Sequence, residues 1–192
     1  MKNFISGIFV IVLFAAVLGT GVLFNTKFFG GEKIPASNNG DAAAPPECLK
    51  TFDEFFEYVY NGKGKTNIAE DAAAQEKWLS KHLKKIFTEN IKVMSKPDNS
   101  HDFPSNGTFV GSWEFPASFS VAGSRRYENR SVVDVRYKWG RGQNYEGDER
   151  LTSFIFVLED GKWKLDDIYT FRGEFIGEGS LVQDLKTANK SH

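Results

Sequence analysis

The chain has 192 residues, of which 41% are hydrophobic and 15% aromatic, a composition that suits one folded domain and excludes both wholesale disorder and a collagen-like repeat. Its 24 Lys and Arg residues almost balance 25 Asp and Glu residues, and the net charge is -1. A chain without excess positive charge has no global attraction to nucleic acid, so we predict no nucleic-acid partner.

The first element in chain order is an uncharged apolar segment, residues 4–24. As a helix that rises about 1.5 Å per residue, it would measure about 30 Å, the thickness of the hydrocarbon core of a bilayer. We predict that residues 1–25 form a transmembrane anchor that contacts the membrane through residues 4–24. A cleaved signal peptide is the alternative, although the apolar core of such a signal is usually only about 7–15 residues long. A buried helix of a soluble domain fits less well, since the segment is apolar on all sides.

Both main interpretations place the rest of the chain outside the cytoplasm. An uncleaved anchor leaves the domain in the periplasm, attached to the cytoplasmic membrane, whereas cleavage leaves it secreted. Residues 26–47 are rich in Gly, Pro, Ala and Asn without a hydrophobic period, and we predict a flexible linker there. The single cysteine, Cys48, cannot form an intramolecular disulfide and is interpreted as an incidental thiol.

The first third of the remaining chain has the apolar spacing of helices. Apolar residues recur every three or four positions over residues 49–59, which predicts a first helix. A second helix is predicted to start near Asn67 or Asp71, with Leu79 on its apolar side, and Pro97 forbids its continuation.

Beyond Pro97 the apolar period changes to two, which is typical of half-buried strands. The predicted strands cover residues 113–121, 133–139, 151–158 and 162–171. Pro116 indicates that the first strand is broken or lies at an edge, and Asp160-Gly161 predicts a hairpin turn. Ser180 with Gln183 fits the cap of a short last helix. Residues 48–192 are therefore predicted to form an α+β domain, with N-terminal helices packed on a curved antiparallel sheet of about four strands.

The two N-terminal helices, the phrase LSKHLKKIF, and DGKWKLDDI followed by SLVQDL resemble the nuclear transport factor two-like superfamily over roughly residues 49–187. That superfamily also contains ketosteroid isomerase and SnoaL-type cyclases, and the chain looks like its exported bacterial domains. The resemblance implies a cone-shaped, cystatin-like fold. Because the superfamily includes enzymes, ligand carriers and interaction modules, the resemblance does not choose an activity.

Sequence motifs for nucleotide, metal and hydrolase sites fail in this chain. Gly64-Lys65-Thr66 resembles the end of a P-loop, but position 59 is Val where that loop needs glycine. The three histidines do not fit a metal-binding motif, and no G-x-S-x-G elbow is present. We therefore predict no metal site and no cofactor.

One constellation could carry chemistry. In the last predicted strand, Asp167 has the same parity as Trp163 and Leu165, so it would point with the apolar face. A buried carboxylate has a raised pKa that suits a general base, and Tyr137 or Tyr169 could hold an enolate oxygen, as hydroxyl donors do in ketosteroid isomerase. The structural alternative is that Asp167 lies at a bulge or the sheet rim, paired with Arg136 or a backbone amide.

The candidate ligand-binding residues are Tyr137, Trp139, Asp167 and Tyr169. The aromatic side chains of the domain could line a pocket for a small apolar ligand. The alternative, which we favour, is that they fill the interior as core.

We predict a non-catalytic module that binds a protein partner or a small apolar ligand. The alternative is an isomerase- or dehydratase-like enzyme with Asp167 as general base in an aromatic pocket. A third hypothesis, an immunity protein that occludes a toxin, has no residue of its own to support it. Residues 154–158 are apolar on both faces of their strand, so we expect the second face to be covered either by a homodimer or by a C-terminal segment that folds over the sheet.

Overall fold

The computed structural model describes residues 42–61, 67–102, 104–110, 114–147, 149–172 and 175–191. The predicted anchor or signal, residues 4–24, lies outside these ranges, as does most of the predicted linker. Among the described helices, none is both long enough and apolar enough to cross a membrane. The anchor and the cellular location therefore stay predictions.

The helical part of the domain comes first in the chain, as predicted. Its elements are α1 (Pro46–Phe56), a π-helical turn η1 (Glu57–Asn61), α2 (Ala72–Trp78), α3 (Lys81–Met94) and two 3-10 turns, η2 (Pro97–Asp102) and η3 (Asn106–Phe109). Helix α1 begins inside the predicted linker, because Pro46 fits the first helical turn, where its missing N–H has no partner to lose. Ala44 is also buried, so the folded domain begins before the predicted boundary at Cys48.

The second predicted helix is in fact two helices. The backbone is extended at Leu79 and Ser80, where the Ser80 N–H donates to the carbonyl oxygen of Leu165 (2.8 Å). Each helix starts at its own cap, because the side chains of Asp71 and Ser80 accept backbone N–H groups three residues further on, both at 2.9 Å. The apolar period continues through this break and therefore did not reveal it.

The sheet is an antiparallel meander of five strands rather than about four. The strands are β1 (Ser118–Tyr127), β2 (Arg130–Lys138), β3 (Glu149–Glu159), β4 (Lys162–Arg172) and β5 (Phe175–Ser180), in the order β1-β2-β3-β4-β5, and helix α4 (Leu181–Ser191) follows. Asp160 and Gly161 both have positive φ values, 50° and 75°, and the hairpin turn predicted there is confirmed. The domain is thus α+β, as predicted.

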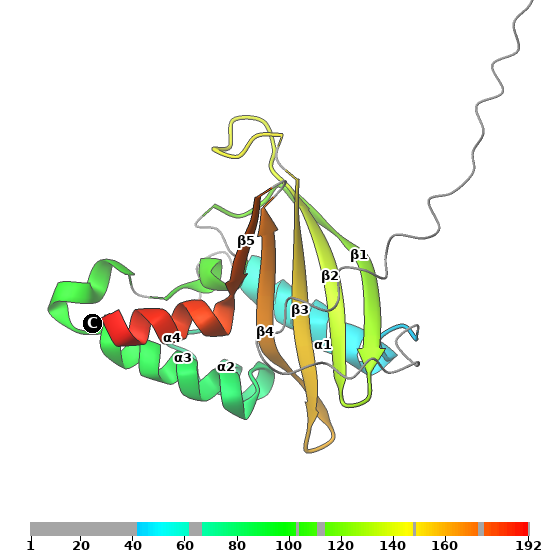
Figure 1. The fold of residues 1–192 in the computed structure, drawn as a ribbon, viewed down its shortest axis with the longest axis horizontal. Helices are drawn as coiled ribbons and strands as arrows, with labels where there is room; N and C mark the ends of the chain where they lie inside the picture. The colour runs from blue at the N-terminus through cyan, green and yellow to red at the C-terminus, as the bar shows by residue number, and fades with distance from the viewer. Residues whose placement is uncertain are drawn as a thin grey trace, which may run out of the picture. The chain divides into compact units, whose positions relative to one another are not determined.

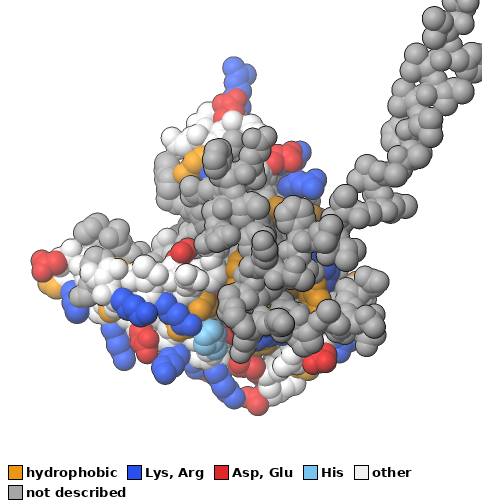
Figure 2. Space-filling view, viewed as in Figure 1, with side chains coloured by type: hydrophobic (Ala, Val, Ile, Leu, Met, Phe, Trp, Pro, Cys, Tyr) orange, Lys and Arg blue, Asp and Glu red, His pale blue; other side chains and the backbone are white. Residues whose placement is uncertain are grey.

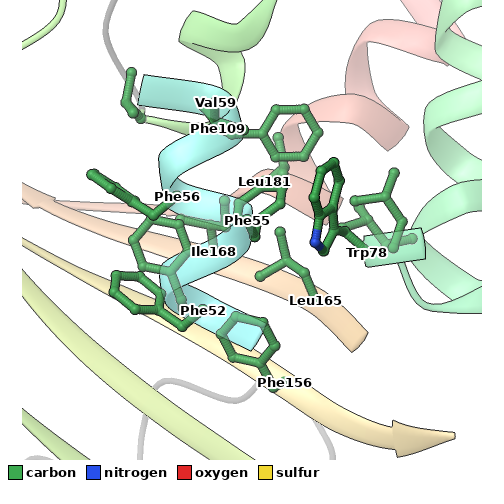
Figure 3. Packing of buried hydrophobic residues seen from close by; sticks show 14 of the residues in the cluster. Phe52, Phe55, Phe56, Val59, Trp78, Phe109, Phe156, Leu165, Ile168 and Leu181 are labelled. Carbon is green, nitrogen blue, oxygen red and sulfur yellow. The ribbon is translucent and has the colours of Figure 1, made fainter. Parts of the chain in front are cut away.

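Helix α1 lies across one face of the sheet, here called the inner face (Figure 1). Figure 3 shows the phenylalanines of α1 directed at side chains of β3 and β4. The ring of Phe52 lies 5.3 Å from that of Phe154, and Phe55 lies 5.6 Å from Phe109 of η3. Burial of each such ring contributes about 1.5–3 kcal/mol, so this aromatic core holds the helices on the sheet.

Candidate functional site

The four predicted ligand-binding residues lie on opposite faces of the sheet. Residues paired directly across antiparallel strands share a face, and Tyr137 pairs with Arg150 on the inner face. Tyr169 pairs with Ser153, which has the opposite parity from Arg150 and therefore belongs to the outer face. Trp139 stays with Tyr137, because their ring centroids lie 6.0 Å apart. The structure therefore separates this pair from Asp167 and Tyr169.

The placement of Asp167 departs from the expected alternation. Leu165 pairs with Phe156, whereas Asp167 pairs with Ile155, so Asp166 is an extra residue in β4. Such a β-bulge reverses the parity of every later residue in the strand. The prediction that Asp167 points with the apolar face of Leu165 is therefore wrong: Asp167 and Tyr169 lie on the outer face.

The Asp167 carboxylate anchors the start of helix α4. Its Oδ1 accepts the backbone N–H groups of Ile168 (2.8 Å) and Val182 (3.0 Å), and Val182 lies in the first turn of α4. Burial raises the pKa of Asp167, although hydrogen bonds from these amides and from Ser180 act against the rise. The structural alternative, a carboxylate at a bulge bonded to backbone amides, describes this geometry.

Asp134 and Ser153, two buried polar residues of the outer face, also have partners. Asp134 accepts a hydrogen bond from the Ser153 hydroxyl (2.5 Å) and pairs with the Arg125 guanidinium (3.0 Å). Tyr169 pairs with Ser153 across the strands and therefore lies next to these polar groups on the outer face. Burial raises the pKa of Tyr169, and the neighbouring Asp167 charge acts in the same direction.

The inner face carries a second polar group, which we call the inner polar cluster. Its members are Tyr137, Trp139, Tyr145, Arg150 and Thr152. The Arg150 guanidinium carbon lies 4.6 Å from the ring centroid of Trp139 and 4.2 Å from that of Tyr145. Arg150 is only 5% exposed, so the two rings hold a buried positive charge against the end of the sheet.

Two hydroxyl groups of the inner polar cluster have no hydrogen-bond partner in the described part of the chain. They belong to Tyr137 and Thr152, and both residues are fully buried. A buried hydroxyl without a partner costs about 1–3 kcal/mol. Burial raises the pKa of Tyr137 well above its ordinary value of 10.0, so this hydroxyl keeps its proton and can donate.

The inner polar cluster lies in aromatic surroundings. Tyr137 is stacked near Phe56 at a centroid distance of 6.1 Å and pairs in register with Phe119. Two hydroxyl donors and a guanidinium on one face suit an acceptor group, above all a carboxylate, while the aromatic rings suit an apolar body.

Sequence analysis missed three of these five residues. Tyr145 lies in the connection between β2 and β3, where no periodicity points to burial. Arg150 and Thr152 share the parity of Phe154 and Phe156, the inward residues of β3. The alternation in β3 could have indicated this, because Arg150 falls at a position where the strand otherwise has buried apolar residues.

A separate polar group joins Ser80, Asp166 and His82 near the start of α3. The Ser80 hydroxyl donates to Asp166 (2.6 Å), and His82 Nδ1 lies 3.4 Å from the same oxygen. A nucleophile triad needs histidine between serine and carboxylate, but here the carboxylate lies between them. Ser80 also caps α3, so this group is structural. Over the described ranges, no cluster of three or more His, Cys, Asp or Glu side chains could hold a metal ion.

A cavity of about 300 Å³ lies between α3, α4 and residues 104–108. Its lining includes Met94, Leu181, Leu185 and Asp184, and none of the predicted site residues. Burial raises the pKa of Asp184.

Charges of both signs are mixed on the visible surface (Figure 2). Exposed ion pairs include Lys81 with Asp160 (2.8 Å) and Lys138 with Glu149 (2.6 Å). Such pairs contribute little to stability, and the absence of a nucleic-acid partner stays a prediction.

Comparisons with known proteins give no family or relative for this chain. No protein-family model matches the chain, and no curated protein matches it.

Proposed function

We propose that the domain is a non-catalytic module that binds a small molecule with a carboxylate and an apolar body at the inner polar cluster. The observation that carries this proposal is the pair of buried hydroxyls, Tyr137 and Thr152, without hydrogen-bond partners in the described part of the chain. A ligand oxygen would accept from them, and the neighbouring Arg150 guanidinium would balance the charge of a carboxylate.

The aromatic core limits where such a ligand could lie. Phe52, Phe55 and Phe156 fill the space between α1 and the middle of the sheet, and all three are fully buried. The polar groups gather instead at the end where β2 leaves the sheet and β3 enters it. A binding site restricted to this end agrees with the expectation that the aromatic residues mostly form core.

The enzyme alternative has less support. It needs Asp167 in the same pocket as a hydroxyl donor, but Tyr137 lies on the other face of the sheet. The Asp167 Oδ1 atom already accepts the backbone N–H groups of Ile168 in β4 and Val182 in α4, so this carboxylate has a role in holding the fold. Tyr169, on the same face as Asp167, is the one candidate donor left for that hypothesis.

We further propose that residues 4–24 tether this module to the cytoplasmic membrane, with the domain on the periplasmic side. The apolar length of the segment supports the tether. If the segment is cleaved instead, the module is secreted. Amino-terminal sequencing of the mature protein from its host distinguishes the two outcomes.

The binding proposal is tested with the full chain in detergent. Phenylacetate, which joins a carboxylate to an aromatic ring, is titrated by calorimetry into the wild type and into Tyr137→Phe, Thr152→Val and Arg150→Met. We expect measurable binding in the wild type, a loss of about fivefold or more for each hydroxyl variant and a larger loss for Arg150→Met.

Ser153→Ala is the matched control, because it removes a buried hydroxyl from the same strand on the outer face. We expect it to bind phenylacetate like the wild type. Native mass spectrometry of the protein purified from its host then identifies any retained small molecule. Equal phenylacetate affinity in all four variants, with no retained mass, would contradict the proposal.

A further inference from the structure

The first half of strand β1, residues 118–122, is an exposed sheet edge. β1 is the first strand in the sheet order (Figure 1). All five of these residues are exposed. Val121 is 47% exposed and Phe119 is 41% exposed, the highest values among the large apolar side chains that the structure describes. An edge of this kind presents backbone N–H and C=O groups that another strand can pair with.

The second half of β1 is protected in the ways that natural edge strands usually are. The chain before α1 runs beside it, since Arg126 N–H donates to Ala42 O (2.9 Å) and Ala44 N–H donates to the Ser124 hydroxyl (3.1 Å). A β-bulge interrupts the register between Val121 and Gly123, and its extra residue, Ala122, is the last residue of the exposed strip. Bulges, charged side chains and covering segments all hinder strand addition. Residues 118–121 precede the bulge, the strip carries no charge, and no backbone hydrogen bond joins its outer edge to another segment in the described part of the chain. The ring of Phe119 packs inward, 4.3 Å from that of Phe56.

Both ends of the exposed strip are defined. On one side, Ala42 and Ala44 occupy the edge beside residues 124–126. On the other side, Pro116 has no N–H to donate, and its carbonyl oxygen accepts the Tyr60 hydroxyl. A pairing strand therefore has about five residues of edge to use, close to the commonest strand length in globular proteins.

The strip is complementary to itself. In an antiparallel pairing about a two-fold axis at Ser120, Phe119 lies opposite Val121 of the partner subunit on the same face of the joined sheet. Ser118 lies opposite Ala122 of the partner subunit, so no charged side chains are brought together. An aromatic residue opposite a β-branched residue is a favourable cross-strand pair, and the symmetry makes it twice.

We propose that two copies of this chain pair through residues 118–122 of β1 and extend the sheet from five strands to ten. The occupant is a second copy rather than another protein because the strip is uncharged, carries its own cross-strand partners and has the length that two-fold pairing about Ser120 requires. The interface is small, so the dimer dissociates on dilution. The proposed membrane tether would favour it by confining both copies to one surface.

Cysteine cross-linking in the full chain tests the register. In Ser120→Cys the two thiols face each other across the axis, within the Cα separation that a disulfide needs. Native Cys48 does not compete, because it is fully buried and burial raises the pKa of its thiol to about 11. Ser95→Cys, exposed at the end of α3, is the control. We expect oxidation to cross-link Ser120→Cys at least tenfold faster than Ser95→Cys.

A mixture of variants sharpens this test. Ser118→Cys and Ala122→Cys face each other only between copies, whereas residue 118 of one copy lies about 13 Å along the strand from residue 118 of the other. We expect rapid cross-linking in the mixture and slow cross-linking of either variant alone. Fast cross-linking of the single variants would overturn the proposed register.

Sedimentation over a dilution series tests the association itself. Val121→Lys places a charge in the strip. Leu158→Lys is the control, because it places the same charge at a similarly exposed apolar residue outside the strip, near the end of β3. We expect Val121→Lys to weaken dimerisation at least tenfold and Leu158→Lys to leave it unchanged. The proposal is overturned if Ser120→Cys cross-links no faster than Ser95→Cys, or if the edge holds a different protein that Val121→Lys releases.

Discussion

The two faces of the sheet carry similar polar side chains that are used in different ways. On the outer face, Asp134 is bonded to Ser153 and Arg125, and Asp167 is bonded to the first turn of α4. On the inner face, Tyr137 and Thr152 are fully buried, yet their hydroxyls have no partner in the described part of the chain. Burial alone therefore does not distinguish a polar group that stabilises the fold from one available to a ligand, whereas hydrogen-bond satisfaction does.

The largest expected effect on stability comes from removing the Asp134 carboxylate from the outer face. Asp134→Ala leaves the Ser153 hydroxyl without its acceptor and Arg125 without its counter-charge, and we expect a loss of about 2–3 kcal/mol in the free energy of unfolding. The estimate lies below that for a fully buried ion pair because Arg125 is partly exposed. Urea denaturation measures it, with the exposed Asp53→Ala as control. A loss as small as that of the control would mean that this network does not stabilise the fold.

On the inner face we expect a smaller effect of opposite sign. Tyr137→Phe and Thr152→Val remove unpaired hydroxyls with little change in shape, so each should raise the free energy of unfolding of the ligand-free protein by about 1 kcal/mol. Thermal unfolding should show a rise of roughly 2–4 °C. The same hydroxyl deletion at Ser153, by Ser153→Ala, should lower stability instead. A destabilised Tyr137→Phe would show that its hydroxyl has a partner in the fold.

The smallest expected effect is a pH dependence at Asp167. Burial raises its pKa above the ordinary value of 3.8, so the folded state holds this proton more tightly than the unfolded state. The stabilising contribution is complete below pH 3.8 and is lost as the pH rises through the folded-state pKa. Asp167→Asn, which keeps an acceptor oxygen but does not titrate, should therefore gain stability relative to the wild type as the pH rises above 3.8.

Urea unfolding of both proteins across this pH range measures the difference. The opposite result would be a wild type whose free energy of unfolding rises relative to that of Asp167→Asn as the pH rises. It would mean that the hydrogen bonds from Ile168 and Val182 outweigh desolvation and lower the pKa of Asp167.

Local sequence determined most of the secondary structure. Apolar spacing identified helix α1, alternation identified strands β2 to β4, and Asp160-Gly161 identified their last hairpin, because each signal depends on a few neighbouring residues. Pro116 indicated an edge, and β1 is an edge strand. The Ser180 cap was also predicted, and its hydroxyl accepts the Gln183 N–H (3.1 Å).

Tertiary structure decided the features that depend on distant parts of the chain. Strand β5 contains two glycines and has no apolar alternation, so its pairing with β4 had no local signal. The break at Leu79 and Ser80 arises from contact with Leu165. In both cases the local residues do not show which distant strand they will contact.

The candidate site shows the same division. Periodicity placed Tyr137 on the inward side of its strand, but the same argument failed for Asp167, because the bulge at Asp166 forms against β3 and reverses the parity. The partners of Arg150, the rings of Trp139 and Tyr145, meet it only when the connection between β2 and β3 folds back. Sequence thus determined which residues avoid water, and the pairing of strands decided which of them share a face.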